Sequence, residues 1–537
     1  MPDRIKSFKV ICSGGLNSNE NHLDLAEKKP GAATRLINYE PSLYGGYRRM
    51  EGYEFFENDY PEVGPGSTEG AVLSVVAFRN EGNGNPYIIA ARKDLDANTY
   101  SFWKMTPGVG WVKLSSAPTR VYADTFNTVL KVRHVQFDFG AGGQIAFVDG
   151  VNPGVVFDGE TWTEITVADA GDQVITAPAV VEVFENHLFM SGDPVNRSVV
   201  AHSAPSDPIV WTAAAGGGQL TVGFPVVQIK PFRDDMFVFG ATSIKKVRAD
   251  AAAAFLLEQV TANVGCIARD SVLEIGGDLI FMAPDGIRPV AGTSRIGDVE
   301  LETISRPIQG RLLQLIKNND LNFLDGVVVR SKSQFRYFLS GSDTGSTDSA
   351  GILGGLTAAD GNISWEFGET LGFRVSCASS EYIGTQEYVL HGDYDGCVYR
   401  QETGNSRNGA DLISIYSTPY LDFGDTEIKK ILHKVNVFIR SEGEFETYIS
   451  LDFDWSDPDT ARPASYTAQS PGSPTVWGGR GIEYGGTAVS FGGNSKPVLT
   501  VDLQGSGYST RLNFVTVGTS KSHSIQGLVF EFALSGR

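Results

Sequence analysis

The sequence predicts an all-β protein with a β-propeller-like body, and three observations lead to this class. Short runs of β-branched and aromatic residues recur about every 8 to 12 residues with turn residues between them, which is typical of a sandwich, a barrel or a propeller. The chain contains 62 glycines and 24 prolines in 537 residues, so it must make many turns. Helical patterns are sparse, and no alternation of strands with helices indicates a parallel α/β sheet.

Residues 1–65 are expected to form an extended N-terminal arm. This stretch is dense in Gly, Asn, Pro and other polar residues, and only Ala33–Tyr39 shows the alternation of a short strand. Such an arm cannot bury a core by itself, so residues 13–56 are expected to lie against another part of the propeller or a neighbouring subunit. We expect that deleting them leaves a soluble body that fails to join an assembly.

Residues 66–425 are expected to form the propeller-like body. The pair Val72–Phe78 and Pro86–Ala91 is predicted to flank a turn over Asn80–Asn85, and Asp158-Gly159 marks another tight turn. The further strand candidates of the body are Ser101–Lys104, Gly110–Leu114, Val132–Phe137, Gln144–Val148, Val155–Phe157, Trp162–Ile165, Val180–Phe184, His187–Ser191, Ser198–His202, Val226–Ile229, Met236–Gly240 and Ile244–Arg248.

A weak internal repeat favours a propeller among the all-β folds. Blocks that read strand, Asp-Gly turn, strand and aromatic residue recur at 147–162, 281–290, 357–367 and 390–400. A recurring unit of this kind is what the blades of a radial repeat produce. Because the spacing is irregular, unrelated β-hairpins with Asp-Gly turns remain an alternative explanation.

Two segments carry a helical pattern. Asp250–Gln259 is rich in alanine and predicts a short helix. Ser305–Lys317 is the better candidate, because Pro307 lies near its start, apolar residues follow at helical spacing and Lys317 lies near its end.

Residues 426–537 are expected to form a separate C-terminal β-rich domain of the sandwich type. Its predicted strands are longer than those of the body, and the stretch from 454 to 495 is rich in loop residues. The predicted strands are Lys434–Arg440, Glu444–Phe453, Pro497–Leu503 and Leu528–Leu534.

The charge balance argues against binding of nucleic acid through a general basic surface. With 44 basic and 63 acidic residues the chain has a net charge of −19 at pH 7. Basic residues cluster modestly at Arg48-Arg49, Lys245-Lys246, Lys429-Lys430 and 306–317, and such groups are mostly solvated faces or partners of acidic residues. An acidic surface would suit a channel wall that repels the phosphate backbone.

No pattern in the sequence predicts a cofactor, a metal or a membrane segment. The motifs GxSxG, HExxH and GxxxxGK[ST] are absent, and the seven histidines show no metal-ligand spacing. No secretory leader and no apolar stretch of about 18 residues is recognisable. The four cysteines form no CxxC pair and are expected to be reduced and buried: Cys12, Cys266, Cys377 and Cys397.

Two groups of carboxylates are the only candidates for acid–base chemistry or cation binding. Asp393 and Asp395 flank Tyr394, and four aspartates occur together in LDFDWSDPD. Residues two apart in a strand share a face, so the first two of the four could converge. An exposed strand face is the favoured explanation; a divalent-cation site and a catalytic pair are the alternatives. The four are Asp452, Asp454, Asp457 and Asp459.

Four blocks of the sequence resemble the tail nozzle, or packaged-DNA-stabilisation, proteins of short-tailed phages (podoviruses). The first, within 13–56, is similar to a pattern "PG-A--L-N-EP---GGYRR--GYE-F" of that family; the others lie at 183–211, 263–293 and 390–409. The residues that carry the first match are Pro30, Gly31, Ala32, Leu36, Asn38, Glu40, Pro41, Gly45, Gly46, Tyr47, Arg48, Arg49, Gly52 and Tyr53. Those of the second are Ser203, Ala204, Pro205, Ser206, Asp207, Pro208 and Trp211.

The resemblance implies a structural protein of the virion and not an enzyme. Members of this family form a homo-oligomeric ring, commonly a hexamer, below the portal–adaptor complex, with a β-propeller body. The ring carries the end of the tail tube, helps to retain packaged genomic DNA until ejection and is surrounded by tail fibre or tailspike proteins. The chain would be assembled in the host cytoplasm and end in the virion tail. The alternative is a tail-associated glycan-binding or polysaccharide-hydrolysing protein.

Overall fold

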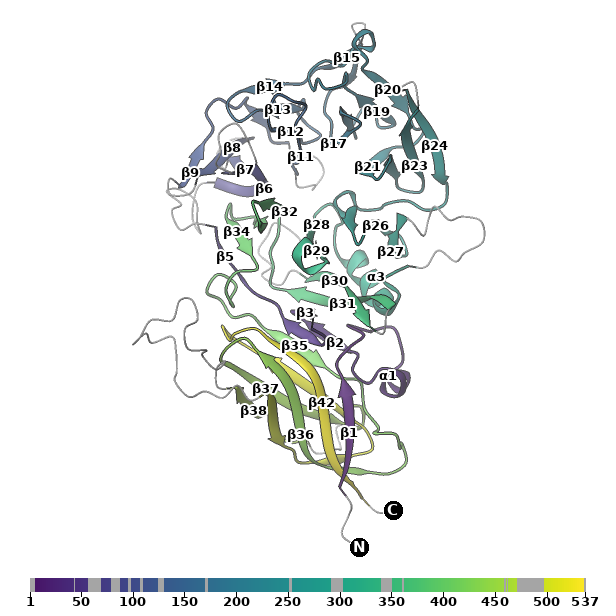
Figure 1. Cartoon of the computed structure of the whole chain (residues 1–537), viewed down its shortest axis with the longest axis vertical. Helices are drawn as coiled ribbons and strands as arrows, with labels where there is room; N and C mark the ends of the chain where they lie inside the picture. Colours follow the sequence, from purple (N-terminus) through teal and green to yellow (C-terminus); the bar gives the residue numbers. More distant parts are fainter. Residues whose placement is uncertain are drawn as a thin grey trace.

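The computed structural model confirms the all-β class, with 54% of the residues in strands and 8% in helices. Figure 1 shows a ring of blades above an elongated pair of sheets that holds both ends of the described chain. The residues that the structure describes are 5–42, 44–56, 69–78, 87–94, 98–106, 110–123, 130–169, 172–250, 254–290, 303–339, 350–359, 362–457, 460, 462–470 and 497–535.

Six separate antiparallel sheets form the blades of a β-propeller. Five of them follow one another along the chain, each starting with its innermost strand. They comprise β6 (Glu69–Phe78), β7 (Tyr87–Asp94), β8 (Thr99–Thr106), β9 (Gly110–Lys113) and β10 (Arg120–Val121); β11 (Arg133–Phe137), β12 (Gln144–Val148), β13 (Val155–Phe157) and β14 (Trp162–Glu164); β17 (Val180–Phe184), β18 (His187–Ser191), β19 (Val199–His202) and β20 (Gly218–Thr221); β21 (Val226–Phe232), β22 (Asp235–Gly240), β23 (Ile244–Ala249) and β24 (Phe255–Thr261); and β25 (Leu273–Ile275), β26 (Asp278–Ala283) and β27 (Gly286–Pro289). A hairpin of β15 (Val167–Asp169) and β16 (Asp172–Ile175) stands outside the blades.

The sixth blade joins the two ends of the propeller. It contains β32 (Cys377–Ile383), β33 (Gln386–Gly392) and β34 (Val398–Gln401), and its outer strand is β5 (Tyr53–Phe55) from the N-terminal segment. Tyr53 lies opposite Gln401 in this antiparallel pair. The inner strand β32 packs against β6, so the last blade in sequence contacts the first.

A nine-stranded sheet completes the ring and links it to the C-terminal domain. Its first strands lie between β25 and β32: β28 (Asp325–Val329), β29 (Gln334–Leu339), β30 (Ala350–Ala359) and β31 (Asn362–Leu371). The sheet continues through β2 (Arg35–Ile37), which pairs in parallel with β31 and antiparallel with β35. It ends with β35 (Ser414–Ser417), β41 (Thr510–Thr516), β37 (Phe445–Phe453) and β38 (Tyr466–Ser470).

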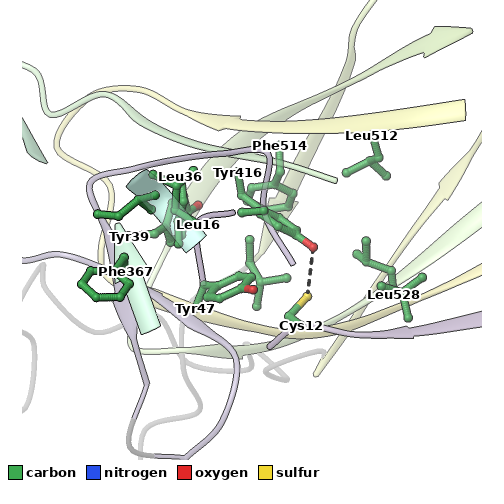
Figure 2. Close-up of a cluster of buried hydrophobic side chains, with 14 of the residues drawn as sticks. Cys12, Leu16, Leu36, Tyr39, Tyr47, Phe367, Tyr416, Leu512, Phe514 and Leu528 are labelled. Atoms are coloured by element: carbon green, nitrogen blue, oxygen red, sulfur yellow. Dashed lines mark hydrogen bonds between the residues drawn. The ribbon is translucent and has the colours of Figure 1, made fainter. Parts of the chain in front are cut away.

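A seven-stranded sheet packs on the far half of the nine-stranded sheet to form a β-sandwich. In β36 and β37 buried and exposed residues alternate, which places one face of each strand in a common core. Figure 2 shows part of that core, where the Cys12 thiol donates to the Tyr416 hydroxyl at 3.6 Å. The seven strands are β1 (Lys6–Ile11), β3 (Tyr39–Pro41), β4 (Tyr47–Arg49), β36 (Lys430–Ser441), β39 (Val498–Asp502), β40 (Ser506–Gly507) and β42 (His523–Leu534).

The segment up to residue 56 lies against the rest of the chain along its whole described length. Strand β1 pairs with the last strand, β42, from Lys6 opposite Phe532 to Ile11 opposite Gly527. Strands β2, β3, β4 and β5 then enter the nine-stranded sheet, the sandwich and the sixth blade in turn. The segment therefore supplies strands to three different sheets.

One helix predicted from the sequence is confirmed and the other is wrong. Ser305–Lys317 corresponds to η3 (Arg306–Ile308) and α3 (Gln309–Asn318). In place of the helix over Asp250–Gln259, Phe255–Thr261 forms β24, because pairing with β23 decides the conformation and local helix propensity is easily overridden by tertiary contacts; residues 251–253 lie outside the described ranges. The other helices are α1 (His22–Lys28), η1 (Ala213–Ala215), η2 (Arg269–Ser271), η4 (Arg330–Lys332) and η5 (Asp454–Ser456).

Three of the Asp-Gly turns occupy the same place in their blades, between the second and third strands. Gly150 has a φ of 81°, Gly286 of 139° and Gly396 of 88°, all in the region that favours glycine. This shared position supports the repeat as a signal of blades. Asp360-Gly361 and the predicted turn at 80–85 lie outside the described residues.

Candidate functional site: the charged axis of the propeller

Two cavities lie along the axis of the propeller. The larger, of about 490 Å³, is lined by the starts of the inner strands and by the turns after β12 and β18; we call it the axial cavity. The smaller, of about 200 Å³, is lined by residues of β6, β11, β17, β21, β25, β28 and β32. Lys131, Arg133 and Asp270 line both cavities, so these side chains separate them.

Ion pairs between three parts of the ring hold this partition together. Arg133 at the start of β11 donates from Nε and Nη2 to the carboxylate of Asp270 in η2, at 2.6 and 2.7 Å. Lys131 donates to Asp325, the first residue of β28, at 2.9 Å and to the Leu324 carbonyl at 2.6 Å. Its Nζ also lies 3.6 Å from Asp270. We call Lys131, Arg133, Asp270 and Asp325 the axial cluster.

The axial cluster shifts the pKa values of its carboxyl groups in opposite directions. Burial would raise the pKa of Asp270, but the charges of Arg133 and Lys131 outweigh it and hold this pKa below its usual value. Asp325 is buried and lies near the charge of Asp270, and its pKa rises to about 6 although Lys131 opposes the shift. Asp270 is therefore held firmly ionised, while Asp325 is still mostly ionised at pH 7 but takes up a proton at a pH not far below it.

The smaller cavity is polar as well. The Ser74 hydroxyl lies 3.1 Å from Nδ1 of His134, and Lys230 of β21 forms an ion pair with Glu182 of β17. Burial lowers the pKa of His134 to about 4, which keeps its ring neutral at pH 7. Polar side chains of adjacent inner strands thus pair with one another beside the axis.

Within the described ranges, no group of three His, Cys, Asp or Glu side chains is placed to hold a metal ion. The four cysteines are buried thiols without disulfides, as predicted. Burial raises the pKa of the Cys266 thiol to about 11 and of the other three to about 12, so all four are protonated at neutral pH.

Asp452 and Asp454 of the C-terminal candidate group bind different partners and do not converge. Asp452 in β37 accepts hydrogen bonds from Arg511 at 2.6 Å and Asn513 at 2.9 Å. Asp454 leaves the strand with a φ of 48° and accepts the backbone N–H groups of residues 508 and 509. Asp457 lies just after η5, and Asp459 lies outside the described residues.

The other candidate aspartates stabilise a turn. Asp393 accepts the backbone N–H groups of Asp395 and Cys397, at 3.0 and 2.8 Å, and the Tyr399 hydroxyl at 3.1 Å. Asp395 pairs with Arg374 at 2.6 Å. These contacts account for both carboxylates as parts of the β33–β34 connection.

Arg49 is a buried centre of hydrogen bonds, which its place in a basic pair did not indicate. It is fully buried and donates to the Ser414 hydroxyl at 3.2 Å and to the carbonyls of Leu412 and Gly518 at 2.7 Å each, and to that of Ser520. Its neighbour Arg48 pairs with three glutamates around the junction of propeller and sandwich, namely Glu40, Glu51 and Glu442.

Residues of the first block let the N-terminal segment pack closely against other parts of the backbone. A Cβ atom on Gly31 would lie 1.7 Å from the Ile11 carbonyl oxygen, and one on Gly52 would lie 1.9 Å from that of Ser406. Asn38 has a φ of 51°, and its side chain donates to the carbonyls of residues 371 and 413 and accepts the N–H of residue 371. These residue types are therefore required by backbone contacts between distant parts of the chain.

The second block forms a compact turn after β19. Ser206 has a φ of 60°, and Asp207 accepts the N–H groups of Ile209 and Val210 at 2.9 and 3.2 Å. The indole of Trp211 donates to the Pro208 carbonyl at 3.0 Å. The matching residues of both blocks thus shape the fold, while Asp193 and Arg197, which also belong to the second block, line the axial cavity.

No protein-family model matches the chain, and no curated protein matches its sequence. Among the helices of the described residues, none has the length and apolar character needed to span a membrane.

Proposed function

We propose that this chain is a structural subunit of a short-tailed phage virion, a nozzle protein that forms a homo-oligomeric ring, expected to be a hexamer, at the distal end of the tail. In this role it carries the DNA conduit below the portal–adaptor complex, helps to retain packaged DNA and offers attachment to fibres or tailspikes. The propeller is the observation that supports this proposal most, because the sequence resemblance implies that fold. The protein performs no catalytic step in this role.

The closed axis bears on where the DNA would pass. Arg133, Lys131 and Asp270 bridge the centre of the propeller, so a duplex has no passage through a single chain. The conduit would be the space enclosed by the ring of subunits. A net charge of −19 suits the wall of such a conduit, because few cations are left to grip the phosphate backbone.

The test is electron microscopy of virions of the phage that encodes this chain, labelled with gold-conjugated antibodies against it. Label at the distal end of a short tail supports the proposal, and mass measurement of the isolated tail then gives the copy number. Antibody absorbed beforehand with the purified protein is the control. Virions without label would contradict the proposal and make polysaccharide hydrolysis the next assay.

A tail-associated glycan-binding protein is the second candidate, and one surface feature favours it. Trp455 is 50% exposed and stacks on Tyr420 at 5.1 Å and 17°, with the His22 ring against its edge at 5.2 Å. Exposed rings of this kind offer a flat apolar face to a sugar. Binding of host surface polysaccharide that is lost in Trp455→Ala, but kept in Tyr44→Ala at another exposed ring, would support this alternative.

A further inference from the structure

We propose that the axial cavity binds a small oxyanion, a phosphate or carboxylate group, through Arg269 and Arg197. This inference does not depend on the proposed role in a phage tail. Four cationic side chains line the cavity but only three carboxylates do, although the chain as a whole is strongly acidic. The cations are Lys131, Arg133, Arg197 and Arg269; the carboxylates are Asp149, Asp193 and Asp270.

All three carboxylates already have partners. Asp149 accepts the N–H groups of residues 151 and 152 and the Tyr100 hydroxyl at 2.6 Å. Asp193 accepts four backbone N–H groups, those of residues 176, 177, 195 and 196. Asp270 belongs to the axial cluster with Arg133 and Lys131. The acidic side chains of the cavity are therefore used to fix turns and to close the axis.

Arg269 and Arg197 lack a carboxylate partner among the described residues. Arg269 donates from Nε to the Val227 carbonyl at 2.8 Å, and Arg197 donates from Nε to the Pro194 carbonyl at 3.0 Å. These bonds fix the direction of each guanidinium, while the terminal Nη groups make no hydrogen bond within the described part of the chain. Arg269 is half-buried and Arg197 lies exposed at the mouth of the cavity.

Electrostatics adds to this geometry. Burial, and secondly the charge of Arg133, lower the pKa of Arg269 to about 10. The positive charge of Arg269 is thus poorly compensated by the protein alone. An oxyanion beside it would supply the missing counter-charge.

The chemistry and size of the cavity define the class of ligand. The planar guanidinium fork matches the two oxygens of a carboxylate or phosphate, and bonds between such ions are the strong ones. A volume of about 490 Å³ admits a small molecule, and the axial cluster closes its floor. Apolar side chains such as Leu130, Val226 and Leu321 complete the wall and would contact the remainder of the ligand.

Titration calorimetry of the full-length protein with inorganic phosphate, and separately with succinate, tests the proposal at constant ionic strength. We expect saturable binding of at least one of them; the tighter one tells whether a phosphoryl or a carboxylate group is preferred. Arg269→Gln should weaken that binding about tenfold or more, the loss expected for a charged hydrogen-bonding partner. Arg197→Gln at the exposed mouth should also weaken it, and this variant remains informative if Arg269→Gln does not fold.

The matched control is Arg400→Gln. Arg400 is also half-buried, packs over the Tyr388 ring at 4.3 Å and lies in β34, away from the axis, so its loss should leave the affinity unchanged. Absence of saturable binding of both anions at tens of millimolar would overturn the proposal. Equal affinities for the wild-type protein and both cavity variants would overturn it as well.

Discussion

Replacing Lys131 with Met should destabilise the protein strongly at neutral pH, because it leaves Asp325 charged and unpaired at the axis. Lys131 is the only cation that donates a hydrogen bond to Asp325 within the described residues. Breaking a buried ion pair by removing one partner costs about 3–5 kcal/mol of the free energy of unfolding. Asp270 keeps its two bonds from Arg133, so the loss should arise chiefly at Asp325.

The pH dependence of this loss follows from the pKa of Asp325, which is already raised to about 6 in the folded protein. A raised carboxyl pKa means that the folded state takes up its proton more readily than the unfolded state, so this group favours folding at low pH and opposes it as the pH rises. Without Lys131 the pKa should rise further. The Lys131→Met variant should therefore lose most stability at pH 7.5 and much less at pH 5.

Urea unfolding, followed by tryptophan fluorescence at pH 7.5 and pH 5, measures this difference. Adding Asp325→Asn to Lys131→Met should restore most of the stability at pH 7.5, because the unpaired charge is then gone. Lys28→Met is the control: its pair with Asp24 is exposed to solvent, so its loss should leave the urea midpoint almost unchanged. An equal loss at both pH values, or no recovery in the double variant, would refute the reasoning.

Three further outcomes are expected. Burial lowers the pKa values of His391 and His523 to about 3, so below pH 6.5 the unfolded state takes up protons that the folded state does not. Each histidine should therefore lower the free energy of unfolding by about 2 kcal/mol between pH 7.5 and pH 5, measured as a falling urea midpoint. A midpoint that stays constant over this range would contradict this. Gly31→Ala should cost about 3 kcal/mol in the same assay, because its Cβ would overlap a backbone carbonyl, whereas Gly310→Ala in α3 meets only one side-chain atom at 3.6 Å and should be harmless. A thiol reagent should modify none of the four cysteines of the native protein and all four after denaturation; rapid labelling of the native protein would show that the thiols are exposed.

Local sequence patterns predict most of the strands, because each inner strand needs a run of apolar residues. The predicted strand His187–Ser191 coincides with β18, and Val72–Phe78 lies within β6. The alanines at the start of Asp250–Gln259 favour a helix, but pairing with β23 makes Phe255–Thr261 a strand, because such tertiary pairing overrides local propensity. Length, turn residues and periodicity are local signals, whereas strand pairing is not.

The charged axis could not be predicted from the same signals. Lys131 lies just before β11 and Arg133 is its first residue, and the two alternate with apolar residues, a pattern that predicts a solvated strand face. Their partners Asp325 and Asp270 lie 194 and 137 residues further along the chain, and only closure of the ring brings them together. The buried role of Arg49 could not be predicted for the same reason, because the carbonyls to which it donates belong to residues more than 360 positions away.

The pairing of the N-terminal segment within its own chain limits which surfaces could join subunits in the proposed ring. Its strands pair with β42, β31, β35 and β34, so neither the sandwich nor the sixth blade is complete until both ends of the chain are present. Deleting residues 13–56 would remove β2 from the middle of a sheet, and the soluble remainder expected from the sequence would instead lose much of its core. Because β1 to β5 already pair within their own chain, this segment would contact a neighbouring subunit of the proposed ring through side chains that stay exposed, such as Ile5, Ile11 and Leu23.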